Sequence, residues 1–338
     1  MKALVLKDFH EMVVAERPDP VAGRGEVLVR TVATGICGSD LHGFTGANGR
    51  RVPGQVMGHE TAGRIAALGP DVTGLTVGGL ATVNPVVSCG HCPSCTAGAE
   101  HHCPEKYVIG VAPAVSAAFA EYVVAPAGNV VALPDTMPAE YGALVEPIAV
   151  GAHAARRGAV TADDTVLVSG GGPIGQAVVL AARRLGVTRI VVSEPDPGRR
   201  ALCATLGAEV VDPAGAPVPE QVRELLGGPA SVAVDAVGLS ATLADALAAT
   251  SLGARIVLVG MAAPRVELAA FAVSTEERTL VGSFSYSAAD FRSAAEWVAG
   301  TPPELAHLVE RQVDLADAPA AFTALAEAPT PGKVLVRF

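Results

Sequence analysis

Four cysteines lie close together in a segment that is rich in Gly, Pro and Ser. They are Cys89, Cys92, Cys95 and Cys103, with the spacing C-x2-C-x2-C-x7-C. Two residues between cysteines allow a tight turn to direct both sulfurs to one point, and four thiolates can surround one tetrahedral zinc ion. Such a closed site leaves no coordination position for a substrate, so we expect a structural zinc. The alternatives are four reduced thiols or two disulfides, and disulfides are rare in reducing compartments.

A second group of side chains with metal-binding chemistry lies nearer the N-terminus. Cys37 follows Gly35-Ile36, His59 and Glu60 follow Met57-Gly58, and Glu146 is a further candidate in a Val-Glu-Pro segment. A thiolate, an imidazole and a carboxylate suit a catalytic zinc that keeps one position for water or substrate. As anions, Cys37 and Glu60 would cancel the charge of Zn²⁺ and leave a neutral site.

A glycine pattern typical of dinucleotide binding lies between a predicted strand and a predicted helix. It is formed by Gly170, Gly172 and Gly175. The glycines permit the tight turn, the approach of the backbone to a pyrophosphate and the packing of helix on strand. Glu194 ends the next predicted strand, where a carboxylate accepts hydrogen bonds from the ribose and repels a 2′-phosphate, so NAD is favoured over NADP. Arg199 and Arg200 weaken this preference, because a guanidinium can pair with a 2′-phosphate.

The pattern of apolar residues predicts two kinds of domain. Short strands separated by turns are predicted at 3–6, 26–33, 61–68, 81–85, 120–124 and 129–133. Strands and helices then alternate: strands are predicted at 165–169, 189–193, 209–211, 231–235, 255–259 and 279–282, with helices at 149–157, 174–185, 198–206, 219–226 and 241–248. Alternation of this kind predicts an α/β fold with a doubly wound parallel sheet. After about residue 286 we expect two helices and a closing strand, 333–338, which return to the first domain.

Length and charge exclude several classes of protein. A chain of 338 residues is long enough for two domains. The net charge of −10 argues against nucleic acid or an anionic membrane as a partner. The first apolar run ends at Lys7, too early for a signal peptide, and no apolar run is long enough to span a membrane. We therefore expect a cytoplasmic protein, in which Cys203 is an ordinary core residue.

Seven motifs, in this order along the chain, are similar to those of one enzyme family. They are G-I-C-G-S-D-L-H (35–42), G-H-E-T-A-G (58–63), the four-cysteine segment (89–103), F-A-E-Y (119–122), V-E-P-I-A-V (145–150), G-G-G-P-I-G (170–175) and V-G-S-F (281–284). On these motifs the chain resembles the zinc-dependent medium-chain dehydrogenases, nearest the sorbitol, butanediol and threonine dehydrogenase branch. The resemblance implies a mostly β, GroES-like catalytic domain at 1–149 with a zinc lobe at 86–106. It also implies a Rossmann domain at 150–286 and a return to the catalytic domain at 287–338.

The resemblance also implies roles for individual residues in the catalytic domain. Cys37, His59 and Glu60 would bind the catalytic zinc, and Glu146 would contact it directly or through its water. Asp40 would orient His59 through its other ring nitrogen. In addition, Ser39 and His42 match a proton relay to solvent; their alternative role is simple turn capping.

The cofactor contacts combine the glycine loop with strand ends. The predicted contacts are Gly170, Gly172, Pro173, Ile174, Gly175, Glu194, Arg199, Val259, Met261, Ser283 and Ser285. Val259 and Met261 are placed by the end of a predicted strand, and Ser283 and Ser285 resemble the family's carboxamide and ribose contacts. Two positions depart from the sorbitol branch: Gly43 stands where an aromatic residue often follows the relay histidine, and Ser285 stands where Arg is common.

The implied activity is the reversible oxidation of a secondary alcohol or polyol to a ketone, with two zinc ions per chain and NAD. One alternative is a dehydrogenase of a phosphorylated or amino sugar-like alcohol, for which Arg50 and Arg51 could meet an anionic group. An alternative of another class is a dinucleotide-binding sensor without turnover. It is disfavoured by the intact Cys37, His59, Glu60 and Ser39. We expect a small-molecule substrate and a homodimer or homotetramer.

Overall fold

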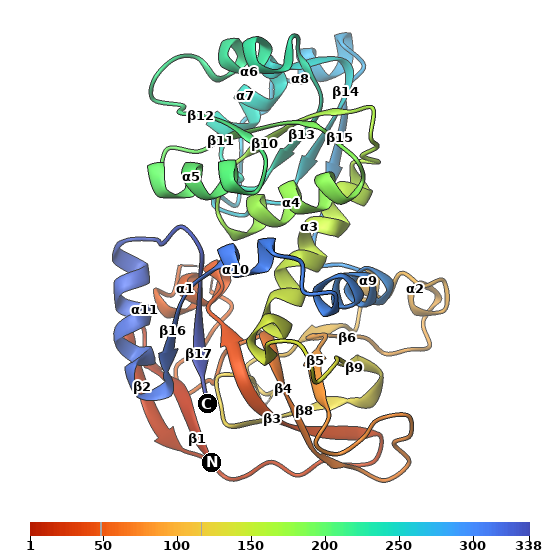
Figure 1. Cartoon of the computed structure of the whole chain (residues 1–338), viewed down its shortest axis with the longest axis vertical. Coiled ribbons are helices and arrows are strands. Elements are labelled where there is room, and N and C mark those ends of the chain that lie inside the picture. The colour runs from red at the N-terminus through yellow and green to blue at the C-terminus, as the bar shows by residue number, and fades with distance from the viewer. Residues whose placement is uncertain (48, 116) are drawn as a thin grey trace. The chain divides into compact units, whose positions relative to one another are not determined.

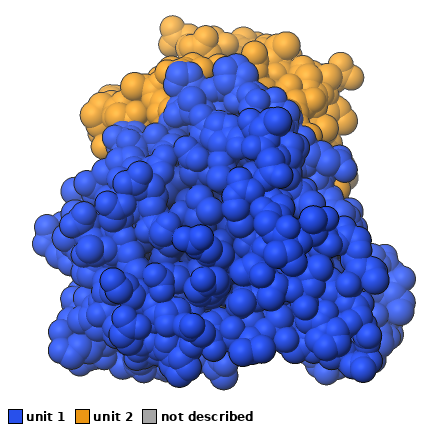
Figure 2. Space-filling view, turned by 60° about the horizontal axis from the view of Figure 1, so that its bottom comes forward, with its two compact units in different colours: residues 1–146, 287–338 blue, residues 147–286 orange. Residues whose placement is uncertain are grey.

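The chain divides into two compact units. The computed structural model describes residues 1–47, 49–115 and 117–338. Unit 1 consists of Met1–Glu146 and Ser287–Phe338, so both ends of the chain belong to it, and unit 2 is Pro147–Tyr286. Figure 2 colours unit 1 blue and unit 2 orange. The sequence predicts domain boundaries at 149 and 286, and the two units meet along the chain at 146 and 286.

Unit 2, all of whose residues are described, is built on one parallel six-stranded sheet. Its strands are β10 (Thr165–Ser169), β11 (Arg189–Ser193), β12 (Glu209–Val211), β13 (Ala230–Asp235), β14 (Thr250–Leu258) and β15 (Thr279–Gly282). The order across the sheet is β12-β11-β10-β13-β14-β15 (Figure 1). This order reverses between β10 and β13, which is the topology of the doubly wound dinucleotide-binding fold. The predicted fold class is confirmed.

Helices alternate with these strands. They are α3 (Val145–Arg157), α4 (Pro173–Arg184), α5 (Pro197–Thr205), α6 (Val218–Leu226), α7 (Ser240–Ala249) and α8 (Ala270–Thr275). Proline is favourable at the first position of α4, because a backbone N–H at that position would have no acceptor within the helix. At the other end, the positive charges of Arg183 and Arg184 in the last turn complement the helix dipole. Cys203 on α5 is fully buried, and burial raises the pKa of its thiol to about 12.

Unit 1 is mostly β structure. Among its described residues, a mixed sheet has the order β16-β17-β3-β4-β5-β9, with β8 also pairing with β3. These strands are β3 (Glu26–Gly35), β4 (Glu60–Leu68), β5 (Leu80–Val83), β8 (Tyr122–Pro126), β9 (Val130–Ala132), β16 (Val309–Asp314) and β17 (Lys333–Arg337). Two smaller sheets pair β1 (Lys2–Asp8) with β2 (Glu11–Glu16) and β6 (Val86–Val87) with β7 (Tyr107–Val108).

The C-terminal segment returns to unit 1 through more elements than the sequence predicts. It contains the helices α9 (Ala288–Ala299), α10 (Glu304–Leu308) and α11 (Ala318–Glu327), and the strands β16 and β17. The prediction of two helices and one strand is therefore wrong. The helix α10 has only five residues, and β16 is an edge strand with mostly exposed polar side chains, so neither shows a clear apolar period.

Within the described parts of the chain, no helix is both long and apolar enough to cross a membrane.

Candidate catalytic and cofactor sites

Cys37, His59 and Glu60 come together in unit 1, with one potential ligand atom from each lying within 4.8 Å of the others. The strands β3 and β4 run antiparallel, and Gly35 at the end of β3 pairs with Glu60 at the start of β4. Cys37 follows β3 by two residues and His59 precedes β4 by one, so this pairing brings the two side chains to the same end of the sheet. Cys37 is also the residue that precedes α1 (Gly38–Phe44).

The backbone before His59 requires glycine. Gly58 has a φ of +99°, a conformation that residues with a side chain rarely adopt. A Cβ at this position would lie 2.7 Å from the backbone nitrogen of Phe119. The Gly-His-Glu sequence therefore positions the histidine through a tight backbone contact.

A buried carboxylate lies behind His59. Asp40 is fully buried, and its Oδ2 accepts a hydrogen bond from the Cys37 N–H at 3.2 Å. Its Oδ1 lies 3.5 Å from Nδ1 of His59 and 3.5 Å from Nη2 of Arg51, which is longer than a normal hydrogen bond but within ion-pair range. Burial alone would raise the pKa of Asp40, but His59 and then Arg51 hold it below its usual value.

The contact between Asp40 and His59 also changes the pKa of the imidazole. Burial would lower the pKa of His59, but the neighbouring Asp40 carboxylate outweighs burial, and the pKa is raised well above 6.5. The Cys37 thiol contributes in the same direction. Because Nδ1 faces Asp40, Nε2 is the ring nitrogen free to serve as a metal ligand.

Lys333 is a component of this group that the sequence analysis missed. It begins β17, is almost fully buried, forms an ion pair with Glu60 and donates a hydrogen bond to the carbonyl of Ile36 at 3.4 Å. Burial would lower the pKa of Lys333, but the charges of Glu60, Cys37 and Glu146 outweigh it, and the pKa is raised. The available signal is a lysine directly before three apolar residues, Val334 to Val336, in the strand Lys333–Arg337.

The donor set fits a zinc ion. It offers one sulfur, one nitrogen and one carboxylate oxygen, which is a typical set for catalytic zinc. Glu60 is fully buried, and its Oε2 has no hydrogen-bond partner among the described residues. A buried carboxylate oxygen without a partner is costly unless a cation or a donor satisfies it.

Glu146 is not part of that close group. It lies in the first turn of α3, is half-buried and is near enough to Lys333 to raise the pKa of the lysine. A contact from Glu146 to the metal, direct or through water, stays a prediction.

The two predicted relay residues lie on α1. Ser39 is half-buried and His42 is exposed. Because they are three residues apart, their side chains lie on the same side of the helix. A proton relay through Ser39 and His42 stays a prediction.

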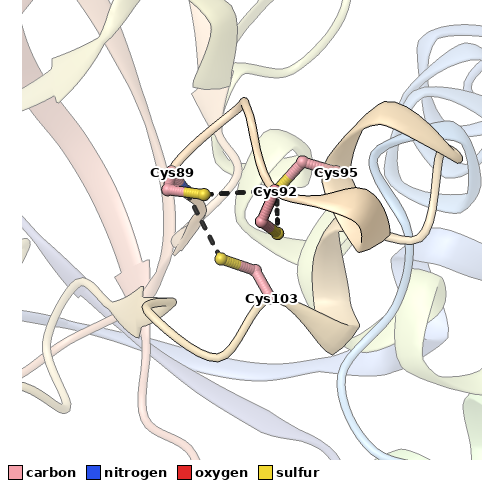
Figure 3. Close-up of side chains that lie close together, drawn as sticks. All are labelled: Cys89, Cys92, Cys95 and Cys103. Carbon is pink, nitrogen blue, oxygen red and sulfur yellow. Dashed lines mark hydrogen bonds between the residues drawn. The ribbon is translucent and has the colours of Figure 1, made fainter.

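The sulfurs of the four-cysteine lobe converge (Figure 3). All four lie within 4.8 Å of one another; Cys92 Sγ is 3.5 Å and Cys89 Sγ is 3.9 Å from Cys95 Sγ. Sulfurs bound to one tetrahedral zinc lie roughly 3.8 Å apart, given Zn–S bonds of about 2.3 Å. All four cysteines are free, which rejects the alternative of two disulfides.

The lobe also favours a cation on electrostatic grounds. The backbone N–H of Cys95 lowers the pKa of Cys92, but burial and the other three sulfurs outweigh it, and the pKa is raised to about 11. Four thiolates at these distances therefore need a cation between them.

The predicted cofactor residues lie at one edge of the unit 2 sheet. The glycine loop follows β10, Glu194 follows β11, Val259 follows β14 and Ser283 follows β15. Because these strands are parallel, all four positions are at the carboxyl edge, where doubly wound folds bind ligands. The hydroxyl of Ser283 is buried without a hydrogen-bond partner among the described residues, whereas Met261 is about half exposed.

The glycine loop has the geometry of a phosphate-binding turn. Gly170 has a φ of +94°, and a Cβ on Gly175 would overlap the carbonyl oxygen of Gly170. Pro173 and Ile174 then form the first turn of α4, whose free N–H groups can receive a phosphate.

Glu194 is fixed by the backbone beside this loop. Its Oε2 accepts from the Gly171 N–H at 2.7 Å and its Oε1 accepts from the Asp196 N–H at 2.9 Å. Arg199 lies close by, with Nη1 3.6 Å from the place of a Cβ on Gly172. Arg200 forms an ion pair with Asp212 at 3.0 Å, and its Nη1 donates a hydrogen bond to the backbone carbonyl of Glu194 at 2.7 Å.

The chain matches two family models and is similar to known dehydrogenases. The family described as alcohol dehydrogenase GroES-like domain matches residues 23–135, and the zinc-binding dehydrogenase family matches residues 173–300. A sorbitol dehydrogenase of Arabidopsis thaliana is 37% identical over 79% of this chain and 76% of its own length. A sorbitol dehydrogenase of Bacillus subtilis (strain 168) is 32% identical over 93% and 90%.

Solved structures of dehydrogenases are similar to this chain over its full length. A putative zinc-binding dehydrogenase from Sinorhizobium meliloti 1021 bound to NADP has a TM-score of 0.92 and 31% identity, covering 100% of this chain and 99% of its own. A structure described as a short chain alcohol dehydrogenase from Escherichia coli CFT073, complexed with NADH, has a TM-score of 0.91 and 31% identity, with the same coverage. The chain belongs to the zinc-dependent medium-chain dehydrogenase/reductase family. It is an oxidoreductase that acts on CH–OH groups with zinc and a nicotinamide dinucleotide.

Proposed function

We propose that this protein oxidises a secondary alcohol or polyol to a ketone, reversibly and with NAD, at a zinc ion held by Cys37, His59 and Glu60. The observation that carries the proposal is the convergence of these three ligand atoms within 4.8 Å. The orphaned Oε2 of the buried Glu60 supports it. Relatives named sorbitol dehydrogenase support the polyol as the substrate class.

Each residue around the site would have a separate role in the reaction. A bound zinc ion would act as a Lewis acid that polarises the substrate oxygen, and bound NAD would accept hydride. Asp40 holds the His59 ring with Nε2 free for the metal. Ser39 would take the proton of the substrate hydroxyl and His42 would pass it to solvent. Glu194 and the glycine loop would hold the adenosine and pyrophosphate parts of the cofactor.

The charges near the metal site include one that the sequence analysis did not count. Cys37 and Glu60 as anions balance a divalent ion, and Lys333 adds one positive charge beside them. Glu146 supplies a compensating negative charge close to Lys333. The lysine therefore permits Glu146 to be ionised there without making the whole site anionic, which supports Glu146 as a water-mediated or exchanging ligand.

The alternative of a phosphorylated substrate receives less support. Arg51 has a side chain that is only 1% exposed and lies beside Asp40, so it does not present its charge to solvent. Arg50 is exposed. A panel of secondary alcohols, polyols and sugar phosphates, each assayed with NAD and NADP, tests the proposal. NADH formation from secondary alcohols or polyols supports it, and turnover of phosphorylated substrates alone contradicts it.

Metal uptake by the metal-free protein should depend on pH through His59. The pKa of His59 is raised well above 6.5, so the imidazole must lose a proton before it can bind zinc. Zinc affinity at the catalytic site should therefore keep rising as the pH increases above 6.5, because His59 stays protonated to a higher pH than an ordinary histidine. Competition titrations measure this change, and Cys37→Ser protein supplies the background from the lobe. An affinity that does not change over this range would contradict the prediction.

The preference for NAD should depend on the charge of Glu194. In Glu194→Gln protein the ratio of kcat/KM with NAD to kcat/KM with NADP should fall by about tenfold, equivalent to about 1.4 kcal/mol, because the 2′-phosphate is no longer repelled. The exposed Glu209 on the next strand gives a matched control, Glu209→Gln, which should leave the ratio unchanged. Equal ratios in wild-type and Glu194→Gln enzyme would show that the carboxylate does not select the cofactor.

We infer a homodimer or homotetramer that uses the edge of the unit 2 sheet. The strand β15 is the last in the order and is partly exposed. Exposed apolar residues precede it in the chain at Leu268 and Phe271 and follow it at Phe284. An uncapped edge strand with apolar neighbours suits pairing with a second copy. Light scattering should show an oligomer for the wild type and a smaller species for Val281→Pro. A monomeric wild type would contradict the inference.

A further inference from the structure

Arg51 is buried although it lies in a loop of polar residues. Its side chain is 1% exposed, and its Nε and Nη2 have no hydrogen-bond partner among the described residues. Nη2 lies 3.5 Å from Oδ1 of Asp40. Burying a guanidinium with so few hydrogen bonds is costly, so the charge of Asp40 must supply a large part of the compensation.

The space for Arg51 is created by Gly43. A Cβ at Gly43 would overlap Cγ of Arg51 and would lie 3.2 Å from its Cβ. It would also lie 3.1 Å from Sδ of Met57. The stem of Arg51 therefore occupies the space beside residue 43 of α1, so the absence of a side chain at Gly43 and the buried position of Arg51 are linked.

The three charged groups form a chain that ends at a predicted metal ligand. Arg51 and His59 both approach the same oxygen of Asp40, at 3.5 Å each. A histidine that binds a metal ion is neutral, so it no longer balances the carboxylate. Arg51 is then the remaining cation that the described residues bring into ion-pair range of Asp40.

We propose that Arg51 is a positioning residue of the catalytic metal site, which holds Asp40 and, through it, the ring of His59 in the orientation that metal binding requires. This inference rests on the proposed metal site. Groups that orient a metal-bound histidine commonly change metal affinity by about 10- to 100-fold when they are removed.

Cobalt substitution tests the proposal without relying on turnover. Co²⁺ bound by the four-sulfur lobe and Co²⁺ bound by the mixed site differ in their absorption spectra, so the affinity of each can be measured by competition with a chelator. Arg51→Met keeps most of the aliphatic stem and removes the charge; it should weaken cobalt binding at the mixed site by about 10- to 100-fold and leave the lobe unchanged. Arg51→Lys should restore part of the affinity. Arg30→Met, at an exposed arginine of β3, is the matched control and should have no effect.

A double-mutant cycle shows whether Arg51 acts through Asp40. Asp40→Asn should weaken the mixed site by itself, and Arg51→Met should add little in that background. If Arg51→Met does not fold, Gly43→Ala displaces the stem and should cause a smaller loss that also disappears in Asp40→Asn protein. Unchanged affinity in Arg51→Met protein, or full losses that multiply in the double mutant, would overturn the proposal. A wild-type protein that binds cobalt only at the lobe would instead overturn the proposed function.

Discussion

Cys37→Ser protein is expected to lose alcohol oxidation while it keeps its fold and the zinc of the lobe. Removing the thiolate removes one of three converging ligands, and the loss of several kcal/mol of transition-state stabilisation corresponds to a fall in kcat/KM of at least about a thousandfold. Metal analysis should give one zinc per chain in the variant and two in the wild type.

The matched control for this variant is another buried cysteine. Cys203 lies outside the two predicted metal sites, and Cys203→Ser should retain both zinc ions. Activity in Cys37→Ser protein comparable to that of the wild type would rule out the proposed metal chemistry. Loss of both zinc ions together would show that the substitution damages unit 1 as a whole.

Lys333→Met should strongly destabilise the metal-free protein and affect the zinc-loaded protein less. Glu60 and Lys333 are both almost fully buried, so removing the lysine leaves a buried carboxylate without its cation. Breaking a buried pair in this way costs about 3–5 kcal/mol of unfolding free energy. A zinc ion at Glu60 replaces the lost positive charge, so the deficit should shrink when zinc is added. Denaturant unfolding with and without zinc measures both values.

An exposed lysine gives the comparison. Lys7 pairs with Glu11 on the surface at 2.7 Å, and Lys7→Met should change the free energy of unfolding far less than Lys333→Met, with or without zinc. If Lys333→Met is no more destabilising than Lys7→Met, or if zinc does not reduce its deficit, Lys333 is not the cation that balances Glu60.

The parts of the sites that can be predicted from the sequence are those encoded by short spacing. The four cysteines of the lobe lie within one loop, and the glycines of the dinucleotide loop lie within one turn, so local spacing nearly determines their geometry. The doubly wound parallel sheet of unit 2 is predicted by the alternation of strands and helices.

Contacts between distant segments were not predictable in this way. Lys333 is 273 residues from Glu60 in the sequence, and it reaches Glu60 because β17 pairs with β3, a pairing that no local pattern encodes. Arg51 lies in a polar sequence that is typical of a surface loop, and its burial depends on the missing side chain of Gly43. The roles of such residues become visible only in the tertiary structure, because the sequence shows the residue type but not which side chains surround it.

Anomalous diffraction at the zinc edge, on crystals of enzyme shown to be fully active, tests the central claim most directly. Two peaks per chain are expected, one among the sulfurs of the lobe and one in contact with Cys37 Sγ, a ring nitrogen of His59 and a carboxylate oxygen of Glu60. A single peak at the lobe, in crystals of the active enzyme, would contradict the assignment of this group as the catalytic metal site.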